Sequence, residues 1–325
     1  MLKSGIQTIK HNRILIRNYK KDILLGISVA DAMGVPFEFL KSNEISISAG
    51  AEMIGFGSHN QEPGTFSDDS SMTFCTAEAL IDTFDINRMA TNFLSWKNQN
   101  YWTASNEVFD IGNTTLQALN RLEQGVSPYF SGESDELSNG NGSMMRILPL
   151  VFTIQHLPIE KRYSITKAVS GITHAHIRSV MACFYYLEFA RLIIEGKEKK
   201  IICALLSNEL QAFFESQTET KKELAHFDRI FNGGFLNRFD VNDINSTGYV
   251  IDTLEAALYS FLKFNRYEMI VIQAIQLGND TDTIASIAGG LAALYYGNQT
   301  IPVNWLNQLK RKEDIIDLAN RWNYY

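Results

Sequence analysis

Apolar residues recur at helical spacing along most of the chain. In segment 251–264, Leu254, Leu258 and Phe261 fall on one face of an expected helix. Similar patterns predict further helices at 22–33, 70–83, 177–195 and 283–296. The last of these is apolar and small nearly all round, which is typical of a helix buried in a core. Strand signals are few, and no linker rich in proline, glycine or serine divides the chain. The pattern therefore predicts one compact all-α domain.

The segments between the expected helices include four long ones that are rich in glycine, asparagine and serine. They are 40–66, 98–113, 131–146 and 232–248. Long loops in a compact domain often carry the functional residues. We therefore expect the site to be built from these loops and the helix ends beside them.

Composition and charge exclude several classes of protein. The chain has 325 residues, of which 45% are apolar, and this is enough for a large core. The net charge of -7 gives no basic field to attract nucleic acid or an anionic membrane. No apolar run is long enough for a membrane span. Cys75, Cys183 and Cys203 form no CxxC pair, so we expect free thiols in the reducing cytoplasm rather than a zinc site.

The first 21 residues differ from the rest of the chain. Lysine and arginine alternate there with isoleucine and leucine, and no acidic residue occurs before Asp22. The apolar stretch is too broken for a secretory signal. A transit peptide remains open as an alternative, but we favour a basic extension that docks on the domain or on a partner. The expected organisation is an extension over 1–21 and a domain over 22–325.

Two acidic clusters, Ser67-Asp68-Asp69 and Asp280-Thr281-Asp282-Thr283, each stand just before an expected helix. Taken alone, each is explained by helix capping. Adjacent aspartates repel each other, however, unless a cation lies nearby. Together the clusters offer only oxygen ligands, which suit Mg²⁺, Mn²⁺ or Ca²⁺ rather than zinc or copper. Their four carboxylates can balance two divalent ions, so we expect the clusters to meet in a two-metal hydrolase site.

The order of motifs along the chain points to a family. The motifs are Asp31-Ala32-Met33-Gly34-Val35-Pro36-Phe37-Glu38-Phe39, the two acidic clusters, Asn139-Gly140-Asn141-Gly142-Ser143-Met144-Met145-Arg146, Thr173-His174 and Gly248-Tyr249. In this order the chain resembles the ADP-ribosylglycohydrolase family over roughly residues 22–300. The resemblance implies an all-α fold with two Mg²⁺ or Mn²⁺ ions. It also implies an enzyme that cleaves ADP-ribose from modified side chains, chiefly arginine or serine.

The resemblance implies roles for individual residues. The implied metal ligands are Ser67, Asp68, Asp69, Asp280, Asp282 and Thr283. The implied catalytic residues are Asp68, Asp69, Asp282 and Glu38, the last acting on the attacking water or gating the site. The implied substrate contacts are Asp110, Asn141, Gly142, Ser143, Met144, His174 and Tyr249. Ser67 stands where threonine is commoner in the family, and it keeps the hydroxyl.

Simpler interpretations of these residues remain open at this point. Without the resemblance, Glu38 is a surface carboxylate after a helix, and the Gly140–Met144 loop is only a turn. His174 is then a structural histidine with satisfied hydrogen bonds, and Tyr249 is a packing residue.

We therefore predict a metal-dependent hydrolase that removes ADP-ribose from modified proteins, chiefly from arginine, and so reverses mono-ADP-ribosylation. One alternative is an immunity protein that neutralises an ADP-ribosylating toxin by hydrolysis or by binding through residues 1–21. Another is a relative that binds ADP-ribose without catalysis. The expected partners are an ADP-ribosylated protein and the product ADP-ribose, without nucleic acid or membrane, and we expect a monomer.

Overall fold

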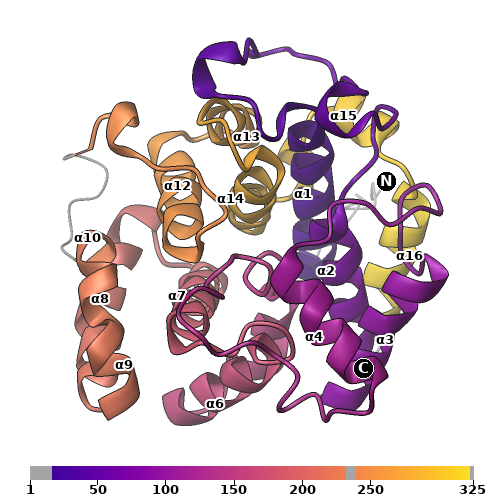
Figure 1. Cartoon of the computed structure of the whole chain (residues 1–325). Helices are drawn as coiled ribbons and strands as arrows, with labels where there is room; N and C mark the ends of the chain where they lie inside the picture. The colour runs from indigo at the N-terminus through magenta and orange to yellow at the C-terminus, as the bar shows by residue number, and fades with distance from the viewer. Residues whose placement is uncertain (1–16, 232–238, 323–325) are drawn as a thin grey trace, which may run out of the picture.

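The structure is a computed structural model that describes residues 17–231 and 239–322 (Figure 1). Within these residues the chain forms helices joined by loops, and isolated β-bridges occur without a sheet. The prediction of an all-α fold is thus confirmed. The α-helices are α1 (Tyr19–Gly34), α2 (Asp68–Ala79), α3 (Ile86–Gln99), α4 (Asn113–Glu123), α5 (Val151–Ile154), α6 (Ile159–Ser170), α7 (Ile177–Ile194), α8 (Lys199–Glu215), α9 (Thr218–Glu223), α10 (Asp228–Phe231), α12 (Val250–Lys263), α13 (Tyr267–Gln276), α14 (Thr281–Tyr296), α15 (Val303–Gln308) and α16 (Lys312–Arg321). Short 3₁₀-helices cover Val35–Phe37, Ser42–Glu44, Gly57–His59, Leu148–Leu150, Leu224–Phe227, Val241–Asp243 and Asn298–Thr300.

The five helices expected from periodicity are present, with shifted ends. The helix expected at 70–83 is α2, which spans Asp68–Ala79 and is followed by a second helix from Ile86. Asp85 caps that second helix, α3, by accepting from the Asn87 N–H at 2.9 Å. Among the described residues, no helix is both long and apolar enough to cross a membrane.

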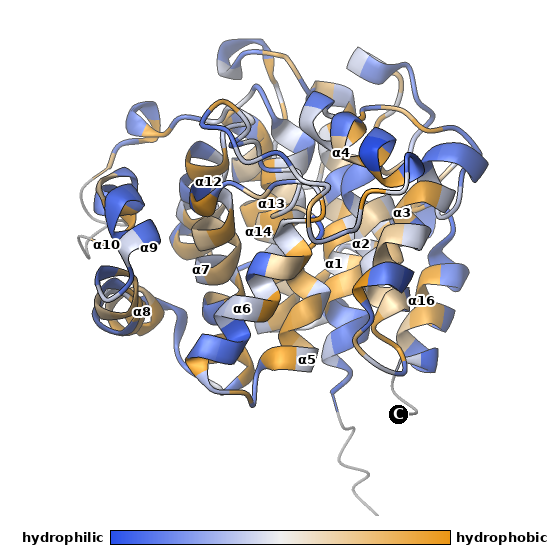
Figure 2. Ribbon diagram, turned by 60° about the horizontal axis from the view of Figure 1, so that its bottom comes forward, coloured by the Kyte–Doolittle hydropathy of each residue, from blue (hydrophilic) through white to orange (hydrophobic). Residues whose placement is uncertain are grey.

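Helix α14 forms the centre of the fold, and α1 packs along its length (Figure 2). Helices α12 and α13 cover other sides of α14, so nearly all of its residues are buried. The close approach of α1 to α14 depends on glycine. A Cβ on Gly26 would lie 2.2 Å from the Ala293 Cβ, and one on Gly289 would lie 2.4 Å from the Ala30 Cβ.

Replacing Gly289 by alanine tests this contact. The added methyl would also lie 2.8 Å from the Gly26 carbonyl oxygen, which is backbone and cannot turn away. We expect the free energy of unfolding, measured in urea, to fall by about 1–3 kcal/mol. Alanine has a higher helix propensity than glycine by about 1 kcal/mol, and this offsets only part of the destabilisation that the steric overlap causes.

Gly112→Ala is the control for this substitution. Its φ of -63° suits alanine, and its Cβ would meet no atom within 4 Å. We expect it to cost no more than about 1 kcal/mol, because Gly112 is the N-cap of α4. Equal stability of Gly289→Ala and the wild type would show that the two helices can separate without cost.

The start of the described chain is hydrogen-bonded to the end of α14. The Arg17 Nη2 donates to the carbonyl oxygens of Ala293 at 2.8 Å and Leu294 at 2.7 Å, in the last turn of α14, where carbonyl groups lack partners within the helix or share a capping N–H. The Arg17 Nε also pairs with the Asp22 carboxylate at 2.6 Å. Helix α1 begins at Tyr19, so the boundary drawn after residue 21 falls inside a helix. The rest of the expected extension, residues 1–16, lies outside the described residues.

Candidate active site

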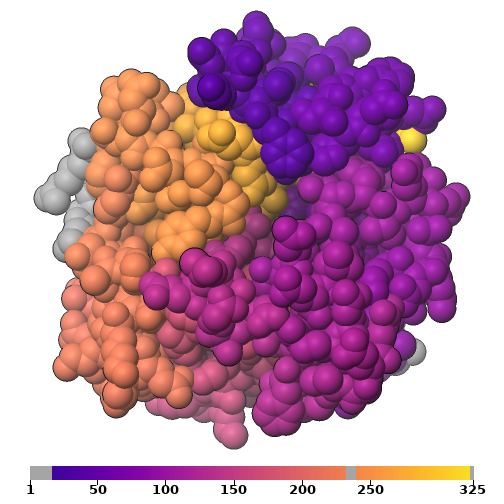
Figure 3. All heavy atoms as spheres, viewed as in Figure 1, coloured from indigo at the N-terminus to yellow at the C-terminus, as the bar shows by residue number. Residues whose placement is uncertain are grey.

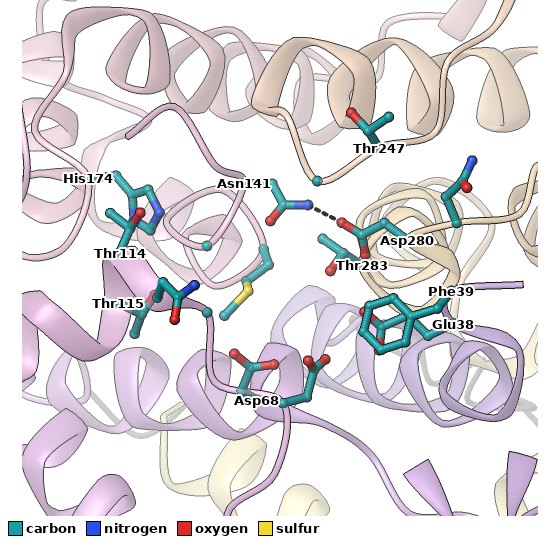
Figure 4. Close-up of a pocket in the computed structure, with 17 residues that line it drawn as sticks. Glu38, Phe39, Asp68, Thr114, Thr115, Asn141, His174, Thr247, Asp280 and Thr283 are labelled. Atoms are coloured by element: carbon teal, nitrogen blue, oxygen red, sulfur yellow. Dashed lines mark hydrogen bonds between the residues drawn. The ribbon is translucent and has the colours of Figure 1, made fainter. Parts of the chain in front are cut away.

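A cavity of about 510 Å³ opens where the N-terminal ends of α2, α4 and α14 come together. Figure 3 shows the surface hollowed where segments from the early, middle and late parts of the chain meet. Three of the four expected functional loops contribute to its wall, together with the loop after α1. The lining residues are Glu38, Phe39, Asp68, Asp110, Gly112, Asn113, Thr114, Thr115, Asn141, Gly142, Met145, His174, Thr247, Gly248, Asn279, Asp280 and Thr283 (Figure 4).

The two acidic clusters meet at the floor of this cavity. Ser67 caps α2 by accepting from the Asp69 N–H at 3.2 Å, so the aspartates occupy the first turn, where the helix dipole favours anions. The second cluster also stands at the start of its helix, α14, but the N-cap residue Asp280 forms no side-chain capping hydrogen bond. The Thr283 hydroxyl lies 3.4 Å from Asp69 Oδ1 and connects the clusters. The two clusters therefore lie together, and side-chain capping is present only in the first.

Asp31 is a member of this cluster to which the sequence analysis gave no role. Its carboxylate accepts from the Ser67 N–H at 3.0 Å and from the Ser70 N–H at 3.0 Å, so it holds the start of α2 against α1. Burial raises the pKa of Asp31 to about 6. Carboxylate oxygens of Asp31, Asp69 and Asp282 lie within 4.8 Å of one another. The available signal was an acidic residue in the largely apolar second half of α1.

The cluster fits a hard divalent cation. Asp69 Oδ2 and Asp282 Oδ2 are buried and have no hydrogen-bond partner in the described structure. Burial raises the pKa of Asp68, Asp69 and Asp282 well above the ordinary value of an aspartate. Buried carboxylates without partners are costly, and a cation would remove that cost. A second group of possible ligands, formed by Glu38, Asp280 and Asp282, shares Asp282 with the first.

Glu38 lies at the mouth of the cavity and is only 5% exposed, so the interpretation as a surface carboxylate is excluded. Its carboxylate is hydrogen-bonded to the His59 Nε2, and burial raises the pKa of Glu38 to about 8. The His59 ring lies between Phe39 and Phe109, with centroid distances of 5.6 and 5.3 Å. Phe39 is 68% exposed beside the opening. Asp110 lines the same mouth.

On the other side of the cavity, Asn141, Gly142 and His174 form the wall (Figure 4). The Asn141 Nδ2 donates to Asp280 Oδ2 at 2.6 Å, which connects the glycine-rich loop to the acidic cluster. A Cβ on Gly142 would lie 2.8 Å from the His174 Cε1, so glycine is needed there for the loop to pack on the imidazole.

Other predicted contacts lie behind the cavity wall. Ser143 is buried and bonds to the Ser170 hydroxyl at 2.9 Å, and Met144 is also fully buried. The neighbouring Met145 lines the cavity instead. The Tyr249 hydroxyl accepts from Arg178 at 3.2 Å, outside the lining set. The roles predicted for Ser143, Met144 and Tyr249 as direct ligand contacts stay predictions.

Several lining residues were missed from the sequence. They are Phe39, Gly112, Asn113, Thr114, Thr115, Met145, Thr247, Gly248 and Asn279. Gly112, Asn113, Thr114 and Thr115 belong to the N-terminal end of α4. The others stand within a quoted motif, as Phe39, Met145 and Gly248 do, or directly beside one, and that position was their only signal.

Comparison with known proteins agrees with this fold. The profile of the ADP-ribosylglycohydrolase family matches residues 16–324. The chain belongs to this family. The resemblance inferred from the order of motifs is thus confirmed. The protein is an ADP-ribosylglycohydrolase, an enzyme that hydrolyses a glycosidic bond of ADP-ribose.

Individual relatives of this ADP-ribosylglycohydrolase are similar over most of their length. It is 28% identical over 307 residues to the ADP-ribosylarginine hydrolase Tri1 of Serratia proteamaculans (strain 568), covering 94% of this chain and 78% of the relative. It is 28% identical over 295 residues to the ADP-ribosyl-[dinitrogen reductase] glycohydrolase of Rhodospirillum rubrum, covering 89% of each chain. A solved structure described as an ADP-ribosylglycohydrolase-related protein complex superposes with a TM-score of 0.76 at 29% identity, covering 94% of this chain and 96% of that one.

Proposed function

We propose that this ADP-ribosylglycohydrolase is metal-dependent and releases ADP-ribose from arginine side chains of modified proteins, reversing mono-ADP-ribosylation. The observation that carries the proposal is the buried cluster of unpartnered carboxylate oxygens at the floor of a 510 Å³ cavity. That volume lies within the usual range for small-molecule sites. Two relatives named ADP-ribosylarginine hydrolase, at 28% and 29% identity, support arginine as the modified residue.

The proposed metal ligands are Ser67, Asp68, Asp69, Asp280, Asp282 and Thr283, which would hold two Mg²⁺ or Mn²⁺ ions. Bound divalent ions supply Lewis-acid activation of water at such a site. Asp31 would keep these ligands in place through its hydrogen bonds to the start of α2. The donor set contains only oxygen, in accordance with the preference of hard cations.

In this proposal Glu38 accepts a proton from the attacking water. Its position beside Asp280 and Asp282 supports the role, because cations held there would favour the ionised carboxylate. Cleavage of the glycosidic bond develops positive charge on the ribose, which the surrounding carboxylates stabilise. At the mouth, the carboxylates of Glu38 and Asp110 lie beside the exposed Phe39 ring. A planar guanidinium cation pairs with carboxylates and stacks on aromatic rings, so this part of the site suits arginine as the leaving side.

Defined peptides test the proposed function. We expect release of ADP-ribose from an ADP-ribosylarginine peptide in Mg²⁺ or Mn²⁺, loss of release with a chelator, and recovery when the metal is restored. An ADP-ribosylserine peptide should react at least about tenfold more slowly, because its leaving group carries no cation for the acidic mouth. Product is quantified by chromatography. Absence of release from both peptides with either metal would contradict the proposal, and faster serine hydrolysis would contradict its arginine specificity.

The described residues bear on the two alternative hypotheses to different degrees. A non-catalytic relative is disfavoured because all four predicted carboxylate ligands are present, and Asp68, Asp69 and Asp282 are buried while Asp280 is partly buried. Neutralisation of a toxin through residues 1–21 stays a hypothesis, since residues 1–16 lie outside the described structure.

A further inference from the structure

Arg146 follows the glycine-rich loop and is completely buried. It has no carboxylate partner among the described residues, and its Nε and Nη1 have no hydrogen-bond partner. Its guanidinium carbon lies 4.5 Å from the centroid of the Phe93 ring, which compensates part of the charge. Burial of a cation without a counter-ion is costly. The third guanidinium nitrogen, Nη2, forms hydrogen bonds, and these bonds indicate the role of Arg146.

The Arg146 Nη2 donates to the Thr173 hydroxyl oxygen at 2.8 Å and to the Val169 carbonyl at 3.2 Å. The same Thr173 oxygen lies 2.9 Å from the His174 Nδ1. Guanidinium nitrogens only donate, so the hydroxyl oxygen must accept from Arg146. The hydroxyl proton then needs an acceptor of its own. Thr173 is fully buried, and the His174 Nδ1 is the acceptor that the described residues offer it.

This chain of donors determines which nitrogen of His174 carries the proton. If Nδ1 were protonated, a buried hydroxyl proton would be left without a partner, at a cost of about 1–3 kcal/mol. Nδ1 is therefore the acceptor, and a neutral imidazole must carry its proton on Nε2. Burial, assisted by the Arg146 charge, lowers the pKa of His174 to about 3, so the ring is neutral at physiological pH.

The Nε2 edge of His174 belongs to the cavity side of the ring. A Cβ added to Gly142, which lines the cavity, would lie 3.4 Å from Nε2, and His174 lines the cavity across from Glu38 (Figure 4). No described residue accepts a hydrogen bond from Nε2. The donor is therefore available to an oxygen of a bound ligand.

We propose that Arg146 and Thr173 are positioning residues that hold His174 as the Nε2–H tautomer, which donates to an oxygen of bound ADP-ribose. The identity of the ligand rests on the proposed function, whereas the tautomer does not. In the other tautomer, Nε2 would direct a lone pair toward the acceptor oxygens of ADP-ribose and would weaken binding. Arg146 and Thr173 thus act without touching the ligand.

The tautomer is measured by ¹⁵N NMR of the imidazole nitrogens in the whole protein, with His174→Gln used to assign the signals. We expect the wild type to show an unprotonated Nδ1 and a protonated Nε2 at His174. In Thr173→Val, which keeps the shape but removes the hydroxyl, we expect the Nδ1–H form to become populated. In Thr173→Ser, which restores the hydroxyl, we expect the wild-type pattern.

ADP-ribose binding is measured by calorimetry on the same proteins. We expect the dissociation constant to rise about tenfold in Thr173→Val, the value of one hydrogen bond, and to return to within about twofold in Thr173→Ser. The KM for an ADP-ribosylarginine peptide should rise by a similar factor with a smaller change in kcat. Thr166→Val is the matched control, because this buried hydroxyl bonds only to the Arg162 carbonyl on α6. It should bind ADP-ribose as the wild type does.

Two results would overturn these positioning roles. One is an NMR spectrum of the wild-type protein in which the proton of His174 is on Nδ1, a result that does not depend on any variant. The other is a folded Thr173→Val protein with unchanged tautomer and unchanged ADP-ribose affinity. Failure of the wild type to bind ADP-ribose would instead overturn the proposed function, and the tautomer measurement would still decide the roles of Arg146 and Thr173.

Discussion

Asp282→Asn will reduce hydrolysis of an ADP-ribosylarginine peptide by at least about 100-fold. Asp282 belongs to two of the three groups of possible metal ligands among the described residues, and its Oδ2 is buried without a partner. Loss of a residue that only supports a metal ligand typically costs 10- to 100-fold, so loss of a shared ligand should cost at least as much. The rate is measured at saturating Mg²⁺ or Mn²⁺ by release of ADP-ribose.

The same substitution should leave the metal-free fold intact. Asparagine has the shape of aspartate and keeps the oxygen that accepts from the Thr283 N–H at 2.9 Å. It also removes one of several buried carboxylates whose pKa values are raised by burial. We therefore expect the melting temperature without metal to stay the same or to rise. The increase in melting temperature on adding Mg²⁺ should become much smaller.

Asp317→Asn is the matched control, since this aspartate lies on the surface of α16 and pairs with Arg321. It should keep both hydrolysis and the Mg²⁺-induced increase in melting temperature. Activity of Asp282→Asn within a few-fold of the wild type would show that Asp282 is not a ligand. A lower melting temperature without metal would show that the substitution damages the fold rather than the site.

The helical core and the position of the acidic clusters were predictable because each depends on local pattern. Apolar spacing marks the buried face of α12, and the uniform apolar character of α14 marks its central position. An acidic pair directly before a helix indicates a helix N-terminus. The meeting of the two clusters was inferred instead from their shared metal-binding chemistry and from the family resemblance, because nothing in local periodicity relates residue 69 to residue 282.

Other parts of the site depend on contacts across the fold that no local pattern encodes. His59 reaches Glu38 from a short 3₁₀-helix within the loop between α1 and α2. Arg146 contacts Thr173 from a separate segment. At the glycine-rich loop, neighbouring side chains point in different directions. Met145 lines the cavity, while Met144 is buried in the core. The sequence motif identified the loop but not which of its side chains face the ligand.

Without divalent cations, the protein should lose stability as the pH rises from about 6.5 to 8. Burial raises the pKa of Glu38 to about 8, and it raises the pKa values of Asp68, Asp69 and Asp282 well above their usual range. In the unfolded chain these carboxylates titrate near pH 4. The folded state therefore binds more protons than the unfolded state in this window, and stability falls as those protons are lost.

The lower limit of this window is set by His174. Its pKa is about 3 in the folded state, so its own effect on the slope of stability with pH, which has the opposite sign, is at half strength near the unfolded pKa of about 6.5 and fades above it. The upper limit is set by Lys199, because burial lowers its pKa to about 8 and its opposing effect begins there. Glu255, whose pKa burial raises to about 7, adds to the expected loss. We expect a slope of at least about 1 kcal/mol per pH unit in urea unfolding with a chelator present.

Mg²⁺ should reverse this dependence. Metal ligands must be deprotonated, so the affinity for Mg²⁺ should increase with pH and binding should release protons. The increase in melting temperature at a fixed Mg²⁺ concentration should accordingly be larger at pH 8 than at pH 6.5, and calorimetry in buffers of different ionisation enthalpy should detect the released protons. Asp282→Asn should show a shallower pH slope without metal and little response to Mg²⁺. A metal-free stability that is flat or rises between pH 6.5 and 8 would mean that the carboxylates are ionised without a cation, and that their burial is compensated by another part of the protein.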